Sequence, residues 1–195
     1  MTAARRSGPA SMRVVAGEAK GRRLVSAPAS VTRAATERIR MSLFGIVEPL
    51  LEGAAVLDLF AGAGSIGIEA LSRGAARATF VERDRRALAA LRENLEATGL
   101  AARANVVAAD VIAFLGRADR GGPYDLAFCD PPFADVDVLS ATLAHPGLAG
   151  ALTADGLVVA RILRKHPAAL PPTATLQRTK VIGEEALIFL GYNIG

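Results

Sequence analysis

Short apolar runs alternate with longer amphipathic stretches along most of this chain. Each run is bounded by turn residues, and its length suits a buried strand. The predicted strands lie near residues 55–59, 78–82, 104–109, 125–129 and 156–162, and two more runs, 176–181 and 186–190, predict a terminal hairpin. The stretches between the strands have helical spacing, most clearly residues 84–97, which are followed by Thr98 and Gly99. Strands that alternate with helices indicate an α/β fold with a mostly parallel, doubly wound sheet.

The region before the first predicted strand has a different pattern. Apolar and basic residues interleave between Met12 and Val25, around two glycines, and this predicts a hairpin. Residues 36–47 then have the spacing of a helix with one apolar side, which leaves Arg38 and Arg40 to face solvent or a binding partner. The residues of this helix that are expected to face the core are Ile39, Leu43, Phe44 and Val47.

Basic residues are concentrated at the start of the chain. Residues 1–40 contain nine basic and two acidic residues, whereas the remainder contains 14 basic and 17 acidic ones. A basic region on a nearly neutral body is typical of proteins that bind a phosphate-rich partner. We expect a flexible basic tail over 1–11, an extension over 12–50 that binds nucleic acid such as RNA, and a larger domain over 51–195. The candidate residues for that binding are Arg13, Lys20, Arg22, Arg23, Arg33, Arg38 and Arg40.

The tetrapeptide Asp130-Pro131-Pro132-Phe133 follows the fourth predicted strand and carries the candidate chemistry. Open α/β sheets bind their ligands at the carboxyl ends of the strands. Asp130 can accept a hydrogen bond from an amino group, and Pro131 has a carbonyl but no N–H. The ring of Phe133 can stack on a base. Together these groups suit an exocyclic amino group on a planar heterocycle, although an ordinary turn at the end of a strand is the simpler alternative.

A glycine-rich turn follows the first predicted strand and strengthens that interpretation. Its candidate cofactor-binding residues are Asp58, Phe60, Gly62, Gly64 and Gly67. Glycines let the backbone pass close to a ligand, and the spacing also matches the fingerprint of dinucleotide-binding proteins. However, a carboxylate at Asp58 suits a cationic group better than a pyrophosphate. An aminoacyl-nucleoside such as S-adenosylmethionine carries an ammonium group and no phosphate, so it fits better than NAD.

Acidic residues also follow the second and third predicted strands. Glu82 lies where such folds bind ribose hydroxyls, and its alternative role is the N-cap or first-turn acid of the next helix. Asp110 could accept a hydrogen bond from an adenine amino group while Val111 packs on the ring. Asp110 could also serve as a helix N-cap. Acidic residues at four successive strand ends favour a cofactor site more strongly than any one of them does alone.

These motifs resemble those of class I S-adenosylmethionine-dependent methyltransferases over about residues 54–192. Segments 13–17, 20–24 and 36–44 further resemble the bacterial RsmD-type family, which methylates the exocyclic N2 of a guanine in small-subunit (16S) ribosomal RNA. The family usually has Arg-Pro-Thr-Thr where this chain has Arg33-Ala34-Ala35-Thr36. The resemblance implies a seven-stranded Rossmann-like sheet with an antiparallel last strand. It also implies S-adenosylmethionine as the cofactor and the small ribosomal subunit, or its assembly intermediate, as the partner.

Composition agrees with a compact cytoplasmic enzyme. The chain has 195 residues, of which 51% are hydrophobic, and we expect it to act as a monomer. No apolar run is long enough to span a membrane, and no signal segment is expected. The single cysteine excludes an internal disulfide, and no cluster of cysteine and histidine suggests a metal.

The mechanism expected from these residues is direct methyl transfer. Hydrogen bonds to the Asp130 carboxylate and the Pro131 carbonyl would favour a pyramidal amino nitrogen and stabilise its developing positive charge. Cys129 as a covalent nucleophile is an alternative, but its side chain should point away from Asp130. Two other functions stay open, namely amino methylation of adenine or cytosine in DNA and a non-catalytic role in RNA binding or assembly.

Overall fold

The computed structural model describes residues 12–26, 35–132 and 136–193, and its centre is one seven-stranded sheet. The strands lie in the order β3-β2-β1-β4-β5-β7-β6. β7 is antiparallel to both of its neighbours, so the other six strands run in one direction. This confirms the predicted fold class. The strands are β1 (Ala55–Leu59), β2 (Arg77–Glu82), β3 (Ala104–Ala108), β4 (Tyr124–Cys129), β5 (Leu152–Leu163), β6 (Ala174–Ile182) and β7 (Glu185–Tyr192).

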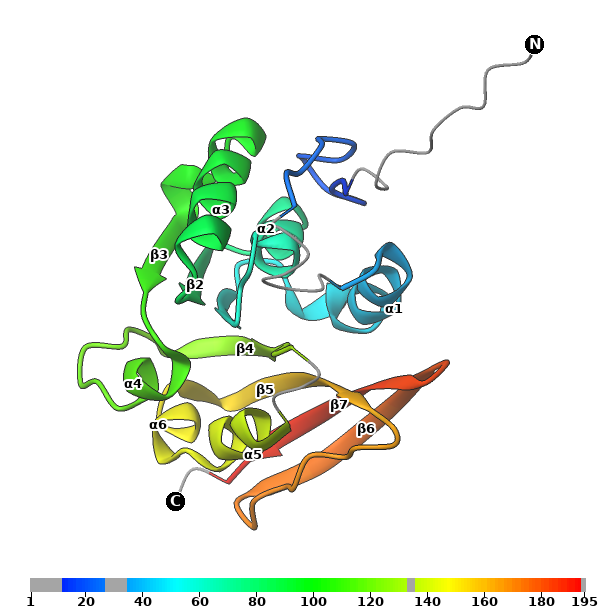
Figure 1. Cartoon of the computed structure of the whole chain (residues 1–195), viewed down its shortest axis with the longest axis vertical. Helices are drawn as coiled ribbons and strands as arrows, with labels where there is room; N and C mark the ends of the chain where they lie inside the picture. The colour runs from blue at the N-terminus through cyan, green and yellow to red at the C-terminus, as the bar shows by residue number, and fades with distance from the viewer. Residues whose placement is uncertain (1–11, 27–34, 133–135, 194–195) are drawn as a thin grey trace.

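Helices cover both faces of the sheet (Figure 1). One face packs against α1 (Glu37–Val47), α2 (Ser65–Ser72) and α3 (Arg85–Thr98). The other face packs against α4 (Val111–Leu115), α5 (Val136–Ala144) and α6 (Pro146–Ala149). Two short 3-10 helices, Glu48–Leu50 and Ala101–Arg103, complete the described elements.

Local sequence signals account for where the long helices begin and end. The Thr36 side chain accepts a hydrogen bond from the Ile39 N–H at the start of α1. Asp84 caps α3 in the same way through the N–H groups of Arg86 and Ala87. Gly99, with φ of +76°, ends α3 in the left-handed region. The helices predicted over 36–47 and 84–97 are therefore confirmed to within a residue or two.

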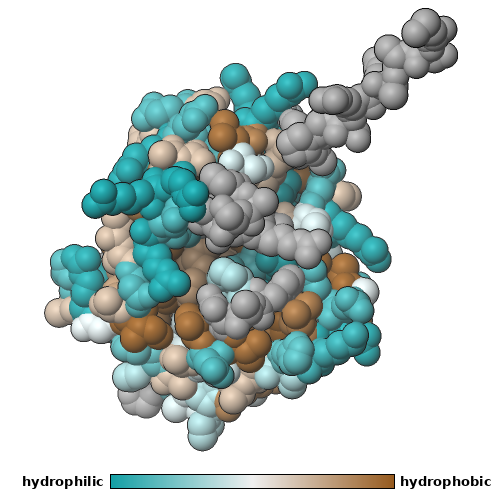
Figure 2. Space-filling view, viewed as in Figure 1, coloured by the Kyte–Doolittle hydropathy of each residue, from teal (hydrophilic) through white to brown (hydrophobic). Residues whose placement is uncertain are grey.

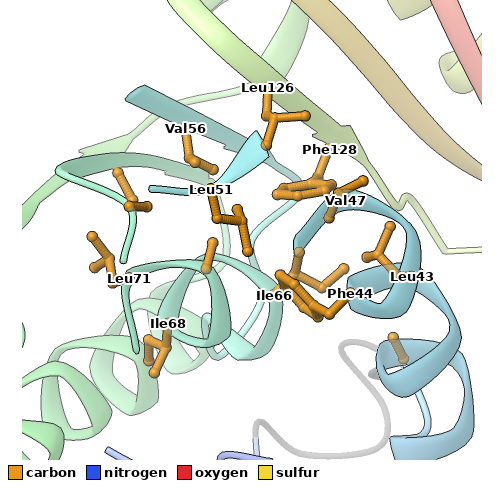
Figure 3. Packing of buried hydrophobic residues seen from close by; sticks show 14 of the residues in the cluster. Leu43, Phe44, Val47, Leu51, Val56, Ile66, Ile68, Leu71, Leu126 and Phe128 are labelled. Carbon is orange, nitrogen blue, oxygen red and sulfur yellow. The ribbon is translucent and has the colours of Figure 1, made fainter. Parts of the chain in front are cut away.

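The core on the α1 side brings the N-terminal helix against the middle of the sheet (Figure 3). The rings of Phe44 on α1 and Phe128 on β4 lie 6.1 Å apart between their centroids. Phe128 lies two residues before Asp130, so the contact holds α1 next to the end of β4. The labelled residues of this cluster are Leu43, Phe44, Val47, Leu51, Val56, Ile66, Ile68, Leu71, Leu126 and Phe128.

The predicted N-terminal hairpin forms a short loop with one antiparallel bridge, between Arg13 and Arg23. Glu69 on α2 anchors this loop, because its carboxylate accepts hydrogen bonds from the N–H groups of Val15 at 2.7 Å and Ala16 at 2.9 Å. Glu69 is only 1% exposed, and its buried charge is satisfied by these two backbone donors and by Arg73, whose Nε lies 2.7 Å from Oε1. The N-terminal loop is thus attached to the helix that follows the glycine-rich turn.

The prediction that Arg40 faces solvent is wrong. Arg40 is 2% exposed, and its guanidinium donates 3.0 Å hydrogen bonds to the carbonyls of Ala35 and Arg13. The N-terminal loop folds back over α1 and covers this side chain. Burial lowers the pKa of Arg40, although the nearby negative charges of Glu69 and Glu37 oppose that shift. Arg38 is exposed, as predicted.

The surface is largely hydrophilic on the face seen in Figure 2, with apolar side chains gathered in the lower middle of the view. None of the helices within the described ranges combines the length and the apolar character that crossing a bilayer requires. Among the described residues, two of the exposed large apolar side chains, Leu176 and Val181, lie on β6, and the others lie on different segments, namely Val25, Met41, Leu50 and Leu170.

Candidate active site

Three of the predicted acidic residues lie on three neighbouring strands of the sheet. Asp58 is in β1, Glu82 is the last residue of β2, and Asp130 directly follows β4. All three carboxylates lie on the α1–α3 side of the sheet, because the residues next to them in the strands belong to the opposite core cluster. Asp58 is 1% exposed and Glu82 is 8% exposed. The sheet therefore collects three poorly hydrated carboxylates beside the glycine-rich turn.

The backbone of the glycine-rich turn donates hydrogen bonds to two of these acids. The N–H of Gly62 lies 2.8 Å from Glu82 Oε2, and the N–H of Gly67 lies 2.8 Å from Asp58 Oδ2. In a phosphate-binding loop such N–H groups point at the ligand instead. Here two of them are already bonded to carboxylates, and this favours a cationic ligand without phosphate.

Two glycines of the turn are required by geometry. Gly64 has φ of +84°, and a Cβ there would lie 2.3 Å from the Leu91 side chain. Gly67 lies in α2, and a Cβ there would lie 2.3 Å from the buried ring of Phe80. Gly67 therefore lets α2 pack closely on β2. Phe60, which joins β1 to the turn, has φ of +66°, an outlier for a bulky residue and typical of functional sites.

Electrostatics also favour a cation at this site. Burial raises the pKa of Asp58 to about 8, the charges of Asp130 and Glu82 raise it as well, and the hydrogen bond from Gly67 opposes them. A cationic group beside Asp58 would relieve this repulsion. The ammonium group of S-adenosylmethionine meets that requirement, so these residues fit the expected cofactor. The described residues contain no group of three or more His, Cys, Asp or Glu that could hold a metal ion.

Asp110 has the predicted role of a helix N-cap. Its Oδ1 accepts hydrogen bonds from the N–H groups of Ile112 at 2.9 Å and Ala113 at 3.3 Å, at the start of α4. Its Oδ2 forms an exposed ion pair with Arg83. Val111 is buried as the first residue of α4. Adenine contacts by Asp110 and Val111 stay a prediction. Glu82 does not cap the helix, because Asp84 does.

Arg161 lies against Asp130 and Glu185 lies against Arg161, and the sequence analysis singled out neither residue. Arg161 on β5 donates through Nε to Asp130 Oδ1 at 2.5 Å and through Nη1 to Glu185 Oε2 at 3.2 Å. A charged residue in the otherwise apolar run of β5 was the available signal. Arg161 lines two small hollows, and Asp130 lines the first of them. One is lined by apolar residues of α1 and the sheet, including Ile39 and Leu43, and the other by Pro131, Pro132, His166 and residues of α5 and β5.

Two predicted contact residues lie outside the described residues, namely Phe133, expected to stack on the base, and Arg33, expected to bind RNA. Four of the predicted basic residues, namely Arg13, Lys20, Arg22 and Arg23, are exposed on the N-terminal loop, and Arg38 is exposed on α1.

Cys129 is buried in the core cluster on the α4–α6 side, opposite Asp130. Burial raises the pKa of its thiol, and the charges of Asp58 and Asp130 raise it further. A buried thiol that resists ionisation is a poor nucleophile. The orientation predicted for Cys129 is thus confirmed.

Comparisons with known proteins agree with this geometry. The profile of the family described as "Conserved hypothetical protein 95" matches residues 12–191. "Ribosomal RNA small subunit methyltransferase D" of Escherichia coli is 36% identical over 181 residues, covering 92% of this chain and 89% of that protein. "Putative rRNA methyltransferase YlbH" of Bacillus subtilis is 37% identical over 76% of this chain and 81% of its own length.

Solved structures show the same fold over nearly the whole chain. A putative methyltransferase of Escherichia coli, yhhF, superposes with a TM-score of 0.81 at 34% identity and covers 95% of this chain and 99% of its own. A hypothetical protein of Thermus thermophilus, TTHA0928, has a TM-score of 0.75 at 33% identity and covers 92% of this chain and 99% of its own. The likeness includes the N-terminal loop and α1 as well as the sheet, because so little of this chain is left uncovered.

Proposed function

Because this chain belongs to the family described as conserved hypothetical protein 95, we propose that it is an rRNA methyltransferase that uses S-adenosylmethionine. Its acceptor is the exocyclic N2 amino group of a guanine in 16S rRNA, within the small ribosomal subunit or an assembly intermediate. The name of its Escherichia coli relative, a small-subunit rRNA methyltransferase, supports the choice of RNA. The resemblance of the sequence motifs to the RsmD type supports the choice of guanine N2.

The observation that carries the proposal is the group of three carboxylates beside the glycine-rich turn. Asp58 and Glu82 accept hydrogen bonds from N–H groups of that turn. In an aminoacyl-nucleoside, the cationic group suits Asp58 and the ribose hydroxyls suit Glu82. Asp130 lies one strand away from Asp58, at the end of β4. The site thus combines a place for the methyl donor with a neighbouring carboxylate for the acceptor.

Asp130 and Pro131 act on the amino group of the base. The Asp130 carboxylate and the Pro131 carbonyl each accept one amino hydrogen, and this favours a pyramidal nitrogen whose lone pair is free. The ring of Phe133 stacks on the base after the nucleotide leaves its RNA context. S-adenosylmethionine, when bound, supplies an electrophilic methyl group, so alignment by the protein provides most of the catalysis. The methylated nitrogen then loses one proton, and no strong base is required.

The basic residues of the N-terminal extension bind phosphates of the RNA. Arg13, Lys20, Arg22 and Arg23 are exposed on one loop, and such contacts position a substrate without reading its sequence. Because Glu69 attaches this loop to α2, the proposed RNA contacts have a fixed relationship to the proposed cofactor site.

The test is transfer of labelled methyl from S-adenosylmethionine to small ribosomal subunits that lack the modification. Deproteinised 16S rRNA and duplex DNA are the parallel acceptors, and the product nucleoside is identified by mass spectrometry. N2-methylguanosine from subunits is the expected product. In the same assay, Asp130→Ala should bind S-adenosylmethionine normally and lose most of its turnover.

Other products would redirect the proposal. Methylated adenine or cytosine in the DNA arm would favour a DNA amino-methyltransferase. Binding of S-adenosylmethionine without transfer to any acceptor would favour a non-catalytic role in assembly. Full turnover by Asp130→Ala would remove Asp130 from the mechanism even if guanine is the acceptor.

A further inference from the structure

Asp130 is held by a buried cation before any substrate is present. The side chain of Arg161 is 5% exposed and that of Asp130 is 12% exposed, and the Nε–Oδ1 distance between them is 2.5 Å. The pair lies between adjacent strands, because Cys129 and Ala160, the residues just before Asp130 and Arg161, are partners in the β4–β5 ladder. A charge-assisted hydrogen bond in such a poorly hydrated place is among the stronger polar contacts in proteins.

Glu185 holds the other side of the same guanidinium. Its Oε2 accepts from Arg161 Nη1 at 3.2 Å, and its side chain is 24% exposed. Glu185 is the first residue of β7, the strand that pairs with β5. Arg161 therefore bridges two carboxylates at the ends of different strands. Its planar guanidinium cannot rotate toward one carboxylate without losing its hydrogen bond to the other.

The geometry divides the two oxygens of Asp130. Arg161 bonds Oδ1, whereas Oδ2 accepts no hydrogen bond within the described residues, so Oδ2 keeps both lone pairs for a hydrogen of a substrate amino group. Strong acceptance by Oδ2 requires the carboxyl group to be ionised, because with Arg161 on Oδ1 the proton of a neutral carboxyl would lie on Oδ2 and make that oxygen a donor. The hollow beside Asp130 is lined mainly by apolar residues, among them Ile66, Phe128 and Val159, and such surroundings disfavour the ionised form.

The charged groups that face Asp130 act in opposite directions. Burial raises the pKa of Asp130, the positive charge of Arg161 on β5 lowers it, and Glu185 on β7 raises it. Asp58 on β1 and the Cys129 thiol on β4 also interact with Asp130 electrostatically. The α1 residues that line the hollow, Ile39 and Leu43, do not ionise. His166 lines the hollow on the other side of Arg161.

We propose that Arg161, braced by Glu185, is a positioning residue that keeps Asp130 ionised and directs its Oδ2 toward the amino group to be methylated. This inference rests on the proposed function, because it assigns a task to Asp130 in methyl transfer. Arg161 does not touch the reacting atoms. It acts through Asp130, and Glu185 acts through Arg161.

The experiment compares pH–rate profiles of the full-length enzyme at saturating S-adenosylmethionine, with unmodified small subunits as substrate. Arg161→Met removes the charge at similar length, Arg161→Lys keeps the charge without the planar fork, and Glu185→Gln removes the opposing acid. Asp130→Ala is the reference variant. Cofactor binding and thermal unfolding are measured for each protein, so that a folding defect is recognised.

The two neutralising substitutions should move the profile in opposite directions. Arg161→Met should lose about tenfold or more of kcat at pH 7 and regain activity as the pH rises, since a shift of one unit in the acidic limb corresponds to a tenfold change. Glu185→Gln should move the same limb to lower pH. Arg161→Lys should restore the position of the limb while kcat stays below the wild-type value. The Kd for S-adenosylmethionine should change by less than about twofold in each.

The outcomes separate this inference from the proposed function. If Asp130→Ala is inactive while Arg161→Met keeps the wild-type profile, Arg161 has no positioning role and the proposed function stands. If Asp130→Ala is fully active, the role of Asp130 itself is wrong. Should Arg161→Met fail to fold, three results decide the question: the shift of the limb to lower pH in Glu185→Gln, the unshifted limb with lowered kcat in Arg161→Lys, and infrared titration of the Asp130 carboxyl in Glu185→Gln. If Glu185→Gln then leaves both the acidic limb of the profile and the titration of the Asp130 carboxyl at their wild-type positions, the inference about Arg161 is overturned.

Discussion

The side-chain amide of Asn94 on α3 forms two hydrogen bonds with the backbone of Val25 in the N-terminal segment. The Val25 N–H donates to Asn94 Oδ1 at 2.7 Å, and Asn94 Nδ2 donates to the Val25 carbonyl at 2.9 Å. The same Nδ2 donates to the carbonyl of Ala63 in the glycine-rich turn at 2.9 Å. Asn94 is fully buried. One side chain therefore fixes the N-terminal extension and the proposed cofactor loop to the same helix.

Asn94→Ala should destabilise the protein and loosen the cofactor loop together. The substitution leaves the buried carbonyl of Ala63 and the partly buried N–H and carbonyl of Val25 without their partner, and we expect a loss of about 2–3 kcal/mol in the free energy of unfolding. Urea denaturation measures the loss, and calorimetry should show weaker binding of S-adenosylmethionine. Asn105→Ala, at an exposed position on β3, is the control and should change stability by less than about 0.5 kcal/mol. Equal stability of the two variants would contradict the anchoring role.

Asp58 should make both stability and cofactor binding depend on pH. Its pKa is raised to about 8 in the folded protein, whereas the unfolded chain has the ordinary value of 3.8. Between these values the folded state holds a proton that the unfolded state has released, so stability falls as the pH rises. A cationic ligand favours the ionised carboxylate. Binding of S-adenosylmethionine between pH 6 and 7.5 should therefore release up to about one proton and strengthen as the pH rises.

Calorimetry in two buffers with different ionisation enthalpies counts the protons released on binding. Asp58→Asn is the matched control, since it keeps the shape and cannot ionise. We expect it to bind the cofactor more weakly, to release fewer protons and to unfold with a flatter dependence on pH. The same proton count in both proteins would show that another group is responsible.

Gly67→Ala should destabilise the protein, although it replaces a glycine within a helix. The new Cβ would lie 2.3 Å from the buried ring of Phe80, and forcing α2 away from β2 should cost about 1–3 kcal/mol. Gly45→Ala is the control, because Gly45 lies in α1 with no atom within 4 Å of an added Cβ. That variant should gain about 0.5–1 kcal/mol. Chemical denaturation of both variants measures the contrast, and a stabilised Gly67→Ala would show that the contact yields without cost.

Local patterns were enough to predict most of the fold and part of the candidate site. The apolar runs located every strand, and Asp58 and Asp130 stood out because each lies at or near the end of such a run. Arg161 could not be assigned a role in the same way, since its contact depends on β5 pairing with β4. The start of β5 at Leu152 was also missed, because polar residues interrupt the run before residue 156. What local patterns leave out are contacts between segments distant in sequence.

Arg38 and Arg40 provide a comparison in which the same substitution should have different effects. Arg38 is exposed on α1, so Arg38→Ala should leave stability within about 0.5 kcal/mol of the wild type. If it contacts a phosphate, its loss should weaken binding to subunits and reduce the dependence of affinity on salt. Arg40→Ala leaves the carbonyls of Ala35 and Arg13 without their donors and opens a cavity, at a cost of about 2–4 kcal/mol.

Urea denaturation and subunit binding at two salt concentrations distinguish the two roles. Arg40→Ala should lower stability and affinity together, because the N-terminal loop loses its attachment to α1. The salt dependence of its affinity for subunits should stay close to that of the wild type, since a buried guanidinium releases no counterion when RNA binds. A reduced salt dependence in Arg40→Ala with unchanged stability would mean that this side chain reaches the RNA. The loop would then have to open on binding, because in the structure Arg40 is bonded to the backbone of Arg13.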